Sequence, residues 1–258
     1  MPVDVTVDAG IAEIVLNRPE KLNALDPEHL AELANALTTA EQAGVRALLL
    51  RGEGRAFCAG RDISDISPAT DDAHAFLSDV VTPVLRQLAA FPAPTFAAAQ
   101  GATLGIGLGI LIATDVVYVG ERARFGSPFA NLGATLDSGG HALFVERLGA
   151  HRTLDLIYTA ELMTGGEAVA GGLFSRVVPD DELLEFTRER VRKVSTGATT
   201  ALLASKALVA ELRDNRVGLW DSIDAENAAQ GALCATDDYA EGFAAFQEKR
   251  PPTFAGRR

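Results

Sequence analysis

The segment Gly101-Ala-Thr-Leu-Gly105-Ile-Gly107-Leu-Gly109-Ile-Leu-Ile-Ala-Thr-Asp115 is apolar throughout and carries no ionisable side chain before Asp115. Glycine stands at every second position from Gly105 to Gly109, although each glycine inside a helix costs about 0.5–1 kcal/mol relative to alanine. Something must therefore require bare backbone here. A segment rich in N–H groups and poor in side chains suits close approach by another backbone or by a ligand. Any acid–base chemistry beside it must come from elsewhere in the chain.

The composition of the 258-residue chain is that of an ordinary globular protein, with 48% hydrophobic and 22% charged residues. This length fits one large domain, or one domain with a smaller appendage. The formal net charge of −12 disfavours a nucleic-acid or anionic-membrane partner. It leaves room for an anionic small molecule, because a few Arg and Lys side chains can hold phosphates. The N-terminus lacks the basic and apolar regions of a signal peptide, so we expect a soluble, cytoplasmic protein.

The cysteines and histidines give no sign of metal or thiol chemistry. Cys58 and Cys234 form no disulfide framework and have no metal-ligand spacing. Cys58 is expected to be a packing residue, because no general base stands near it in the sequence. His29, His74 and His151 fall in predicted helices and are expected at the surface. The sequence therefore predicts no metal site.

One apolar run is long enough to suggest a membrane span. From Phe96 to Ala113 only Gln100 and Thr103 interrupt it. Two prolines just before the run and four glycines within 101–109 divide it into a short strand, a loop and a helix. We therefore expect a buried strand–loop–helix unit and no membrane contact.

Strands alternate with helices over the first two thirds of the chain, which predicts an α/β fold with parallel pairing and right-handed crossovers. The predicted strands are 3–7, 11–16, 45–50, 95–99, 116–119 and 175–178, the first two forming a hairpin. One predicted helix begins after the Asp26-Pro27 cap and another after Gly105. The remaining predicted helices cover 72–89, 180–194, 199–213, 220–233 and 237–248. The sequence thus predicts a core over 1–195 and a C-terminal helical region over 196–258.

Three loops follow core strands, and ligands gather at the ends of strands in open α/β sheets. The loops cover residues 55–63, 101–109 and 125–140. The glycines at 105, 107 and 109 do not have the G-x-G-x-x-G spacing of a dinucleotide site, and no acidic residue follows at the required place. The ligand is therefore not predicted to be a dinucleotide.

A set of short strings, spread in order over nearly the whole chain, carries a family resemblance. They are the segment 101–115, Leu16-Asn-Arg-Pro-Glu-Lys-Leu-Asn-Ala-Leu-Asp26, Phe57-Cys-Ala-Gly-Arg-Asp-Ile63, Phe125-Gly, Asp137-Ser-Gly-Gly140, Leu173-Phe-Ser-Arg-Val-Val-Pro179 and Ala245-Phe-Gln-Glu-Lys-Arg-Pro-Pro-Thr-Phe254. Through these strings the chain resembles the crotonase superfamily, the enoyl-CoA hydratase/isomerase family. The resemblance implies a spiral of ββα units, a C-terminal helical trimerisation region and an acyl-CoA thioester ligand. It implies a homotrimer or a dimer of trimers, and no cofactor beyond the coenzyme A of the substrate.

The resemblance also implies an oxyanion hole made of two backbone N–H groups, those of Arg61 and Ile106. Such a hole holds the thioester oxygen as it becomes enolate-like, and the helix start at Ile106 favours an anion there. The alternative is that Gly60 and Gly105 serve only turns and tight packing. Ile106 is a departure from the family, which often has glycine at this position. A backbone donor does not need glycine, so we expect the isoleucine side chain to narrow the acyl pocket instead.

The substrate-binding residues are likewise implied by the resemblance. The backbone around Ala59, Arg61, Asp62, Ile63 and Ser64 is where the family holds its substrate. Lys21, and Lys249 contributed by a neighbouring subunit, are the expected cations for the phosphates of coenzyme A. The alternative for each lysine is a solvated surface charge. Ile106, Phe129 and the segment 64–75 are expected to shape the acyl pocket.

The chain departs from the hydratase pattern at two positions. Hydration in the hydratase manner is a task for two carboxylates, one on the water and one on the α-proton. In this sequence Gly109 and Phe129 stand where hydratases carry the two glutamates. Hydration by that machinery is therefore not predicted.

One acid remains in a suitable place. Asp137 lies where several superfamily branches have a catalytic aspartate, and the isomerases of phenylacetate breakdown are similar here, including a phenylalanine at the position of Phe129. A single base in an apolar pocket suits double-bond isomerisation, because burial raises its basicity. The alternative is that Asp137 caps the helix that follows, with His141 on the same helix face. Three further possibilities stay open: a non-catalytic acyl-CoA binder, an atypical hydratase, and Asp137 as a nucleophile, as in the dehalogenases, whose aromatic cradle the distant Trp220 does not supply.

Overall fold

A six-stranded sheet forms the centre of the molecule, with the strand order β1-β2-β3-β4-β6-β9. The computed structural model of the chain describes residues 2–64, 66, 69, 71–126 and 128–256. The strands are β1 (Val3–Asp8), β2 (Ile11–Leu16), β3 (Ala47–Gly52), β4 (Thr95–Ala99), β6 (Val116–Gly120) and β9 (Arg176–Val178). β1 and β2 form the predicted hairpin, and all later neighbours pair in parallel. The predicted α/β class is confirmed.

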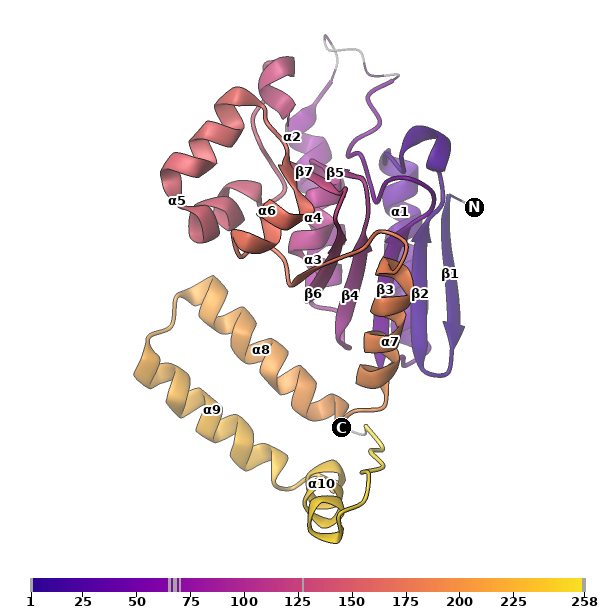
Figure 1. Ribbon diagram of the computed structural model, residues 1–258, viewed down its shortest axis with the longest axis vertical. Coiled ribbons are helices and arrows are strands. Elements are labelled where there is room, and N and C mark those ends of the chain that lie inside the picture. The colour runs from indigo at the N-terminus through magenta and orange to yellow at the C-terminus, as the bar shows by residue number, and fades with distance from the viewer. Residues whose placement is uncertain (1, 65, 67–68, 70, 127, 257–258) are drawn as a thin grey trace.

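Helices cover both faces of this sheet, as Figure 1 shows. Alternate side chains of β3 and β4 point to opposite faces. On one face Leu48 and Leu50 join the large core cluster, which also takes in the apolar stripe of α1 (Pro27–Gln42) and side chains of α3 (Thr82–Ala89). On the other face Leu49 packs in a second cluster with side chains of α7 (Leu183–Ser195). The near-continuous apolar composition of β3 and β4 follows from this double cover.

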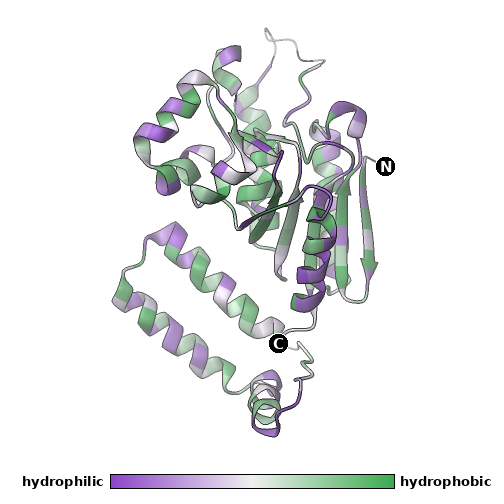
Figure 2. Ribbon diagram, viewed as in Figure 1, coloured by the Kyte–Doolittle hydropathy of each residue, from purple (hydrophilic) through white to green (hydrophobic). Residues whose placement is uncertain are grey.

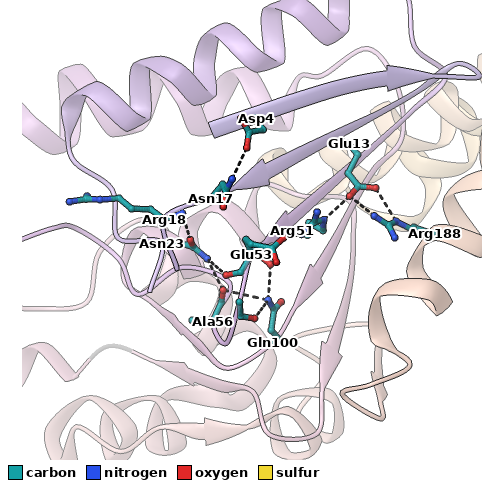
Figure 3. A network of polar contacts seen from close by, with 12 residues as sticks. Asp4, Glu13, Asn17, Arg18, Asn23, Arg51, Glu53, Ala56, Gln100 and Arg188 are labelled. Atoms are coloured by element: carbon teal, nitrogen blue, oxygen red, sulfur yellow. Dashed lines mark hydrogen bonds and ion pairs between the residues drawn. The ribbon is translucent and has the colours of Figure 1, made fainter. Parts of the chain in front are cut away.

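Charged side chains join the sheet to α7 at one point, shown in Figure 3. Glu13 on β2 accepts from Arg51 Nε of β3 at 2.6 Å and from Arg188 of α7 at 2.7 and 3.0 Å. Burial alone would raise the pKa of Glu13, but the hydrogen bonds and charges of the two arginines lower it below its ordinary value.

A second, three-stranded sheet was not predicted from the sequence. It consists of β5 (Ala102–Leu104), β7 (Arg124–Gly126) and β8 (Met163–Thr164). Strands of two or three residues are too short to show a period of two, so no pattern in the sequence indicated them. Its first strand, β5, lies between β4 and α4 (Ile106–Ile112) in the chain, and β7 and β8 follow that helix. Two further helices flank β8 in the chain. They are α5 (Gly140–Thr159), which is kinked at Gly149, and α6 (Gly165–Ala170).

The predicted helix over 72–89 is three consecutive segments. These are α2 (Ala73–Ala75), the π-helix η2 (Phe76–Val81) and α3. Two short 3₁₀ turns, η1 (Pro19–Lys21) and η3 (Pro128–Leu132), lie in the loops of the site. His29, expected at the surface, is buried at 7% exposure in the first turn of α1, with Nδ1 2.7 Å from the Asp26 carboxylate. The prediction for His29 was therefore wrong.

Three C-terminal helices extend away from the core in Figure 1. They are α8 (Thr199–Asn215), α9 (Leu219–Leu233) and α10 (Asp237–Glu248), and they match the predicted helices closely. Two long cationic side chains tie the region to the core. Lys206 on α8 lies 3.0 Å from Asp115, and Arg46 donates to Gly197 O at 2.6 Å and to Phe254 O at 3.2 Å.

Figure 2 shows apolar and polar residues mixed along α8 and α9, and few of these side chains are buried. Thr199 is the buried residue of α8 and Ser222 that of α9. Among the residues that the structure describes, no helix is long and apolar enough to cross a membrane. The apolar run 96–113 is the buried β4, the short β5 and α4, as expected.

Candidate active site

Two glycine turns bring the loop after β3 against the start of α4. Gly60 has φ +102° and Gly105 has φ +50°, conformations that side chains rarely adopt. A Cβ added to Gly60 would lie 3.0 Å from Leu104 O and 3.8 Å from the backbone nitrogen of Ile106. The two turns are therefore in direct backbone contact, and the residues that follow them, Arg61 and Ile106, are neighbours.

The hydrogen bonds around Arg61 define where its N–H group points. Leu25 N donates to Gly60 O at 2.8 Å, and Asp62 N donates to Leu25 O at 2.9 Å, which makes a parallel bridge between Leu25 and Arg61. In such a bridge the flanking residues supply the bonds, so the N–H of Arg61 turns away from Leu25. Within the described ranges, neither this N–H nor that of Ile106 donates to another backbone group. Two N–H groups are thus available side by side.

Two amide side chains hold the loop in front of Arg61, as Figure 3 shows. Asn23 donates to Glu53 O at 3.0 Å and to Ala56 O at 2.8 Å, and it accepts from Arg18 N at 2.8 Å. Gln100 donates to Gly52 O at 2.7 Å. Asn23 is buried at 1% exposure, so its amide is committed to this loop. Sequence reasoning missed both residues, although a lone Asn between apolar neighbours in Leu22-Asn-Ala-Leu25 was a usable signal.

Phe129 lies directly over the second glycine turn. A Cβ on Gly105 would come within 2.8 Å of the tip of the Phe129 ring. The half-buried ring therefore presents an aromatic surface beside the N–H of Ile106, whose own side chain is buried at 2% exposure. The structure thus places Phe129 and the turn that precedes Arg61 on either side of the start of α4, and the predicted roles of Arg61, Ile106 and Phe129 stay predictions.

The helix face at Gly109 is occupied by the loop that precedes α5. A Cβ on Gly109 would lie 2.5 Å from Ser138 Cβ and 3.1 Å from Ser138 O. Ser138 itself has φ +53°, which is uncommon for a non-glycine residue. Any side chain at position 109 would have to displace this loop. The close packing carries Asp137, the preceding residue, toward α4.

Asp137 is a half-buried acid with an unused oxygen. Its Oδ1 atom is buried and has no hydrogen-bond partner in the part of the chain that the structure describes. Burial raises the pKa of Asp137 above its ordinary value, and Ser138 and the charge of His141 oppose this by less. The cap residue of α5 is Gly139, with no side-chain cap hydrogen bond, so Asp137 is not the helix cap that the sequence allowed. A raised pKa and a free oxygen are the properties of a base in a site.

The predicted substrate-binding residues near Arg61 form an exposed polar cluster. Lys21 Nζ lies 2.9 Å from Ser64 Oγ, and Asp62 pairs with Arg18 at 3.0 Å. The hydrogen bonds from Ser64 lower the pKa of Asp62 to about 2, so Asp62 is an ionised loop residue. The other two predicted residues are Ala59 and Ile63.

Ala59 donates its N–H to Leu22 O at 2.9 Å. Ile63 is 54% exposed. Residues 65, 67, 68 and 70 of the predicted pocket segment 64–75 lie outside the described residues.

Lys249 is not brought to this cluster within one chain. It follows α10, which lies at the opposite end of the molecule from α2 and the loop 61–64 in Figure 1. Its predicted role therefore requires a second subunit. Cys58 is buried, and burial raises the pKa of its thiol to about 12, which agrees with a packing residue. Over the described residues, no group of three His, Cys, Asp or Glu side chains could hold a metal ion.

Comparison with known proteins places this geometry in context. The family model described as enoyl-CoA hydratase/isomerase matches residues 6–257. A protein of Rhodobacter capsulatus named probable enoyl-CoA hydratase is 34% identical over 255 residues, which cover 97% of this chain and 96% of that protein. The 1,2-epoxyphenylacetyl-CoA isomerase of Escherichia coli is 32% identical over 256 residues, which cover 97% of each chain.

Solved structures agree. The crystal structure of an enoyl-CoA hydratase from Bacillus anthracis superimposes with a TM-score of 0.90 at 29% identity and covers 100% of both chains. Relatives of this chain thus carry the names of both hydratases and isomerases.

Proposed function

The chain belongs to the enoyl-CoA hydratase/isomerase family, and on that premise we propose that it isomerises the double bond of an enoyl-CoA with Asp137 as its single base. The N–H groups of Arg61 and Ile106 form the oxyanion hole in this proposal. The observation that carries it is the pairing of the two available N–H groups with one half-buried carboxylate whose pKa is raised.

The proposed reaction needs one base and no water. The thioester oxygen accepts hydrogen bonds from the N–H groups of Arg61 and Ile106. Asp137 removes a proton from the carbon next to the thioester, and the electron pair moves onto the thioester oxygen as a dienolate forms. The same carboxyl group returns the proton to the distal carbon of the conjugated system, and the double bond moves. Donors placed for the developing negative charge lower the barrier, because they are already oriented when it forms.

Two features disfavour hydration by the two-carboxylate route. The resemblance places the hydratase glutamates at Gly109 and Phe129. Ser138 fills the space above Gly109, and the Phe129 ring fills that above Gly105. The two carboxylates that would activate a water molecule are therefore both absent from these positions.

We also propose that coenzyme A lies along the polar cluster of Lys21, Asp62 and Ser64, and that the molecule is a homotrimer. Helices of 15 to 17 residues are not stable by themselves when almost none of their side chains is buried, as in α8 and α9. Several large apolar side chains of the region are exposed, among them Val209 at 63%, Trp220 at 76% and Phe246 at 84%. Contact between subunits would bury them and bring Lys249 to a neighbouring site.

Replacing Asp137 tests the proposal. We expect Asp137→Asn to lower turnover of a 3-enoyl-CoA by about 10²–10⁴-fold, the usual contribution of a general base. The matched control is Asp155→Asn, an acid of α5 that pairs with Arg152 at the surface. Full turnover by Asp137→Asn would contradict the assignment. Faster hydration of a 2-enoyl-CoA than isomerisation of a 3-enoyl-CoA by the unaltered enzyme would contradict the reaction class.

A further inference from the structure

The side chain of Arg61 is held from outside its own loop. Its Nη1 lies 3.0 Å from Asp71 Oδ2 and its Nη2 lies 2.7 Å from Asp71 Oδ1. Its Cζ atom lies 4.0 Å from the centre of the Phe76 ring. The guanidinium group is therefore fixed by a bidentate ion pair and by stacking, the two contacts for which arginine is better suited than lysine.

Both partners belong to a segment that is anchored in the core. Asp71 precedes α2, and Phe76 is the first residue of η2, buried at 7% exposure in the large core cluster. The carboxylate of Asp71 is ionised here, because the hydrogen bonds from Arg61 lower its pKa. Arg61 is thus connected to the core through its side chain as well as through its backbone.

The backbone bonds to Leu25 orient the N–H of Arg61. Leu25 N donates to Gly60 O, and the peptide plane that carries this carbonyl also carries the Arg61 N–H. Gly60, at φ +102°, has no side chain that could tie this turn to its surroundings. The side chain of Arg61 supplies a second tie, to the segment that begins at Asp71.

We propose that Asp71 and Phe76 are positioning residues that hold Arg61 so that its N–H group faces the thioester oxygen. The inference rests on the proposed oxyanion role of Arg61. In this proposal the Arg61–Asp71 ion pair and the Phe76 ring contribute to the reaction without touching the substrate. Oriented donors stabilise the transition state, where negative charge develops, more than they stabilise bound substrate. Loosening them therefore lowers kcat more than it weakens substrate binding.

The expected effect is a loss of turnover with intact binding of coenzyme A. A misplacement of about 1 Å in a site costs on the order of 10²-fold in rate, so we expect Asp71→Asn and Arg61→Met each to lower kcat by about ten- to a hundredfold. Arg61→Met keeps the backbone N–H and removes only the held side chain. Free coenzyme A has no thioester oxygen, so its Kd is expected to stay unchanged in both variants.

A double-mutant cycle separates one shared function from two independent defects. The Arg61→Met/Asp71→Asn double variant is expected to lose no more than either single variant, because both remove the same contact. Phe76→Leu, which keeps an apolar side chain in the core, is expected to give a smaller loss of the same kind. The matched control is Asp155→Asn, which removes the acid of the surface ion pair with Arg152 on α5 and does not touch Arg61.

A spectroscopic measurement makes the test independent of turnover. An arylacryloyl-CoA absorbs at longer wavelength when oxyanion donors polarise its carbonyl group, so bound ligand reports the hole directly. We expect a smaller red shift in Asp71→Asn than in the unaltered protein or Asp155→Asn. An unchanged red shift and kcat in Asp71→Asn would overturn the inference, and so would an equal loss of coenzyme A binding. The red shift reports on Arg61 even if Asp137→Asn stays active, so the two proposals fail separately.

Discussion

At the scale of the residue, the candidate site combines backbone N–H groups with a few side chains. The sequence pointed to Arg61, Ile106 and Asp137 because short motifs surround them, and their roles stay predictions. It did not point to Asn23 or Gln100, because each acts on carbonyl groups about 30 to 50 positions away in the chain. Contacts of that kind exist only after folding, and a local pattern such as the lone Asn among apolar residues can mark the residue but not its partners.

The raised pKa of Asp137 predicts a pH dependence of activity. A base must be ionised, so kcat/KM is expected to rise with pH through a pKa above the ordinary 3.8 of an aspartate. The pH profile of initial rates on a 3-enoyl-CoA measures this. Burial makes the folded state hold the proton more tightly than the unfolded state, so ionised Asp137 lowers stability above that pKa. Asp137→Asn should therefore melt no lower than the unaltered protein at neutral pH, which separates loss of a base from loss of the fold.

At the scale of the element, most long segments follow from the sequence and the short strands do not. Buried parallel strands and amphipathic helices have length enough to show their periods, and most of them were predicted close to their observed bounds. The exception is the 20-residue α5, for which no bounds were predicted. β5, β7 and β8 were missed, although this small sheet places Gly105 against Gly60. The glycines of the two turns indicated positive φ angles, but no pattern in the sequence showed that the turns contact each other. The site thus depends on short elements that are individually hard to predict from sequence.

The packing of α4 against the loop before α5 predicts the outcome of restoring a glutamate. Gly109→Glu would force its Cβ to within 2.5 Å of Ser138 Cβ, and overpacking of this kind costs about 1–3 kcal/mol. We expect lower stability in chemical denaturation and no gain of hydratase activity. Gly166→Glu is the matched control, because a Cβ there meets only one side-chain oxygen at 4.0 Å. Adding Ser138→Gly is expected to recover most of the loss, since φ +53° suits glycine. A stable, hydrating Gly109→Glu enzyme would contradict the account.

At the scale of the whole molecule, the core buries its apolar side chains, whereas the C-terminal helices leave several of theirs exposed. The sequence predicted those helices from their periodicity, but periodicity cannot say what an apolar face contacts. In one chain α8, α9 and α10 are fastened mainly by Lys206 and Arg46 and leave large apolar side chains exposed. The proposed trimer supplies the missing contacts, and it also explains why Lys249 lies far from the site of its own chain.

The trimer predicts a particle of three times the 27.1 kDa chain mass by light scattering. Trp220→Glu is expected to reduce that mass, because a charge would enter a contact between subunits. Val7→Glu is the control, since Val7 is 45% exposed and belongs to the edge strand β1 and not to α8, α9 or α10. A stable monomer of unaltered protein would exclude the contribution of Lys249 to a neighbouring site.

The central claim, that Asp137 is the single base beside an oxyanion hole, is tested most directly by proton exchange. In D₂O the enzyme should exchange the α-protons of a bound acyl-CoA for deuterium, a step that needs the base and the hole but no completed turnover. We expect Asp137→Asn to slow this exchange by at least about 10²-fold, with Asp155→Asn unchanged. Exchange by Asp137→Asn at the rate of the unaltered enzyme would show that another group takes the proton.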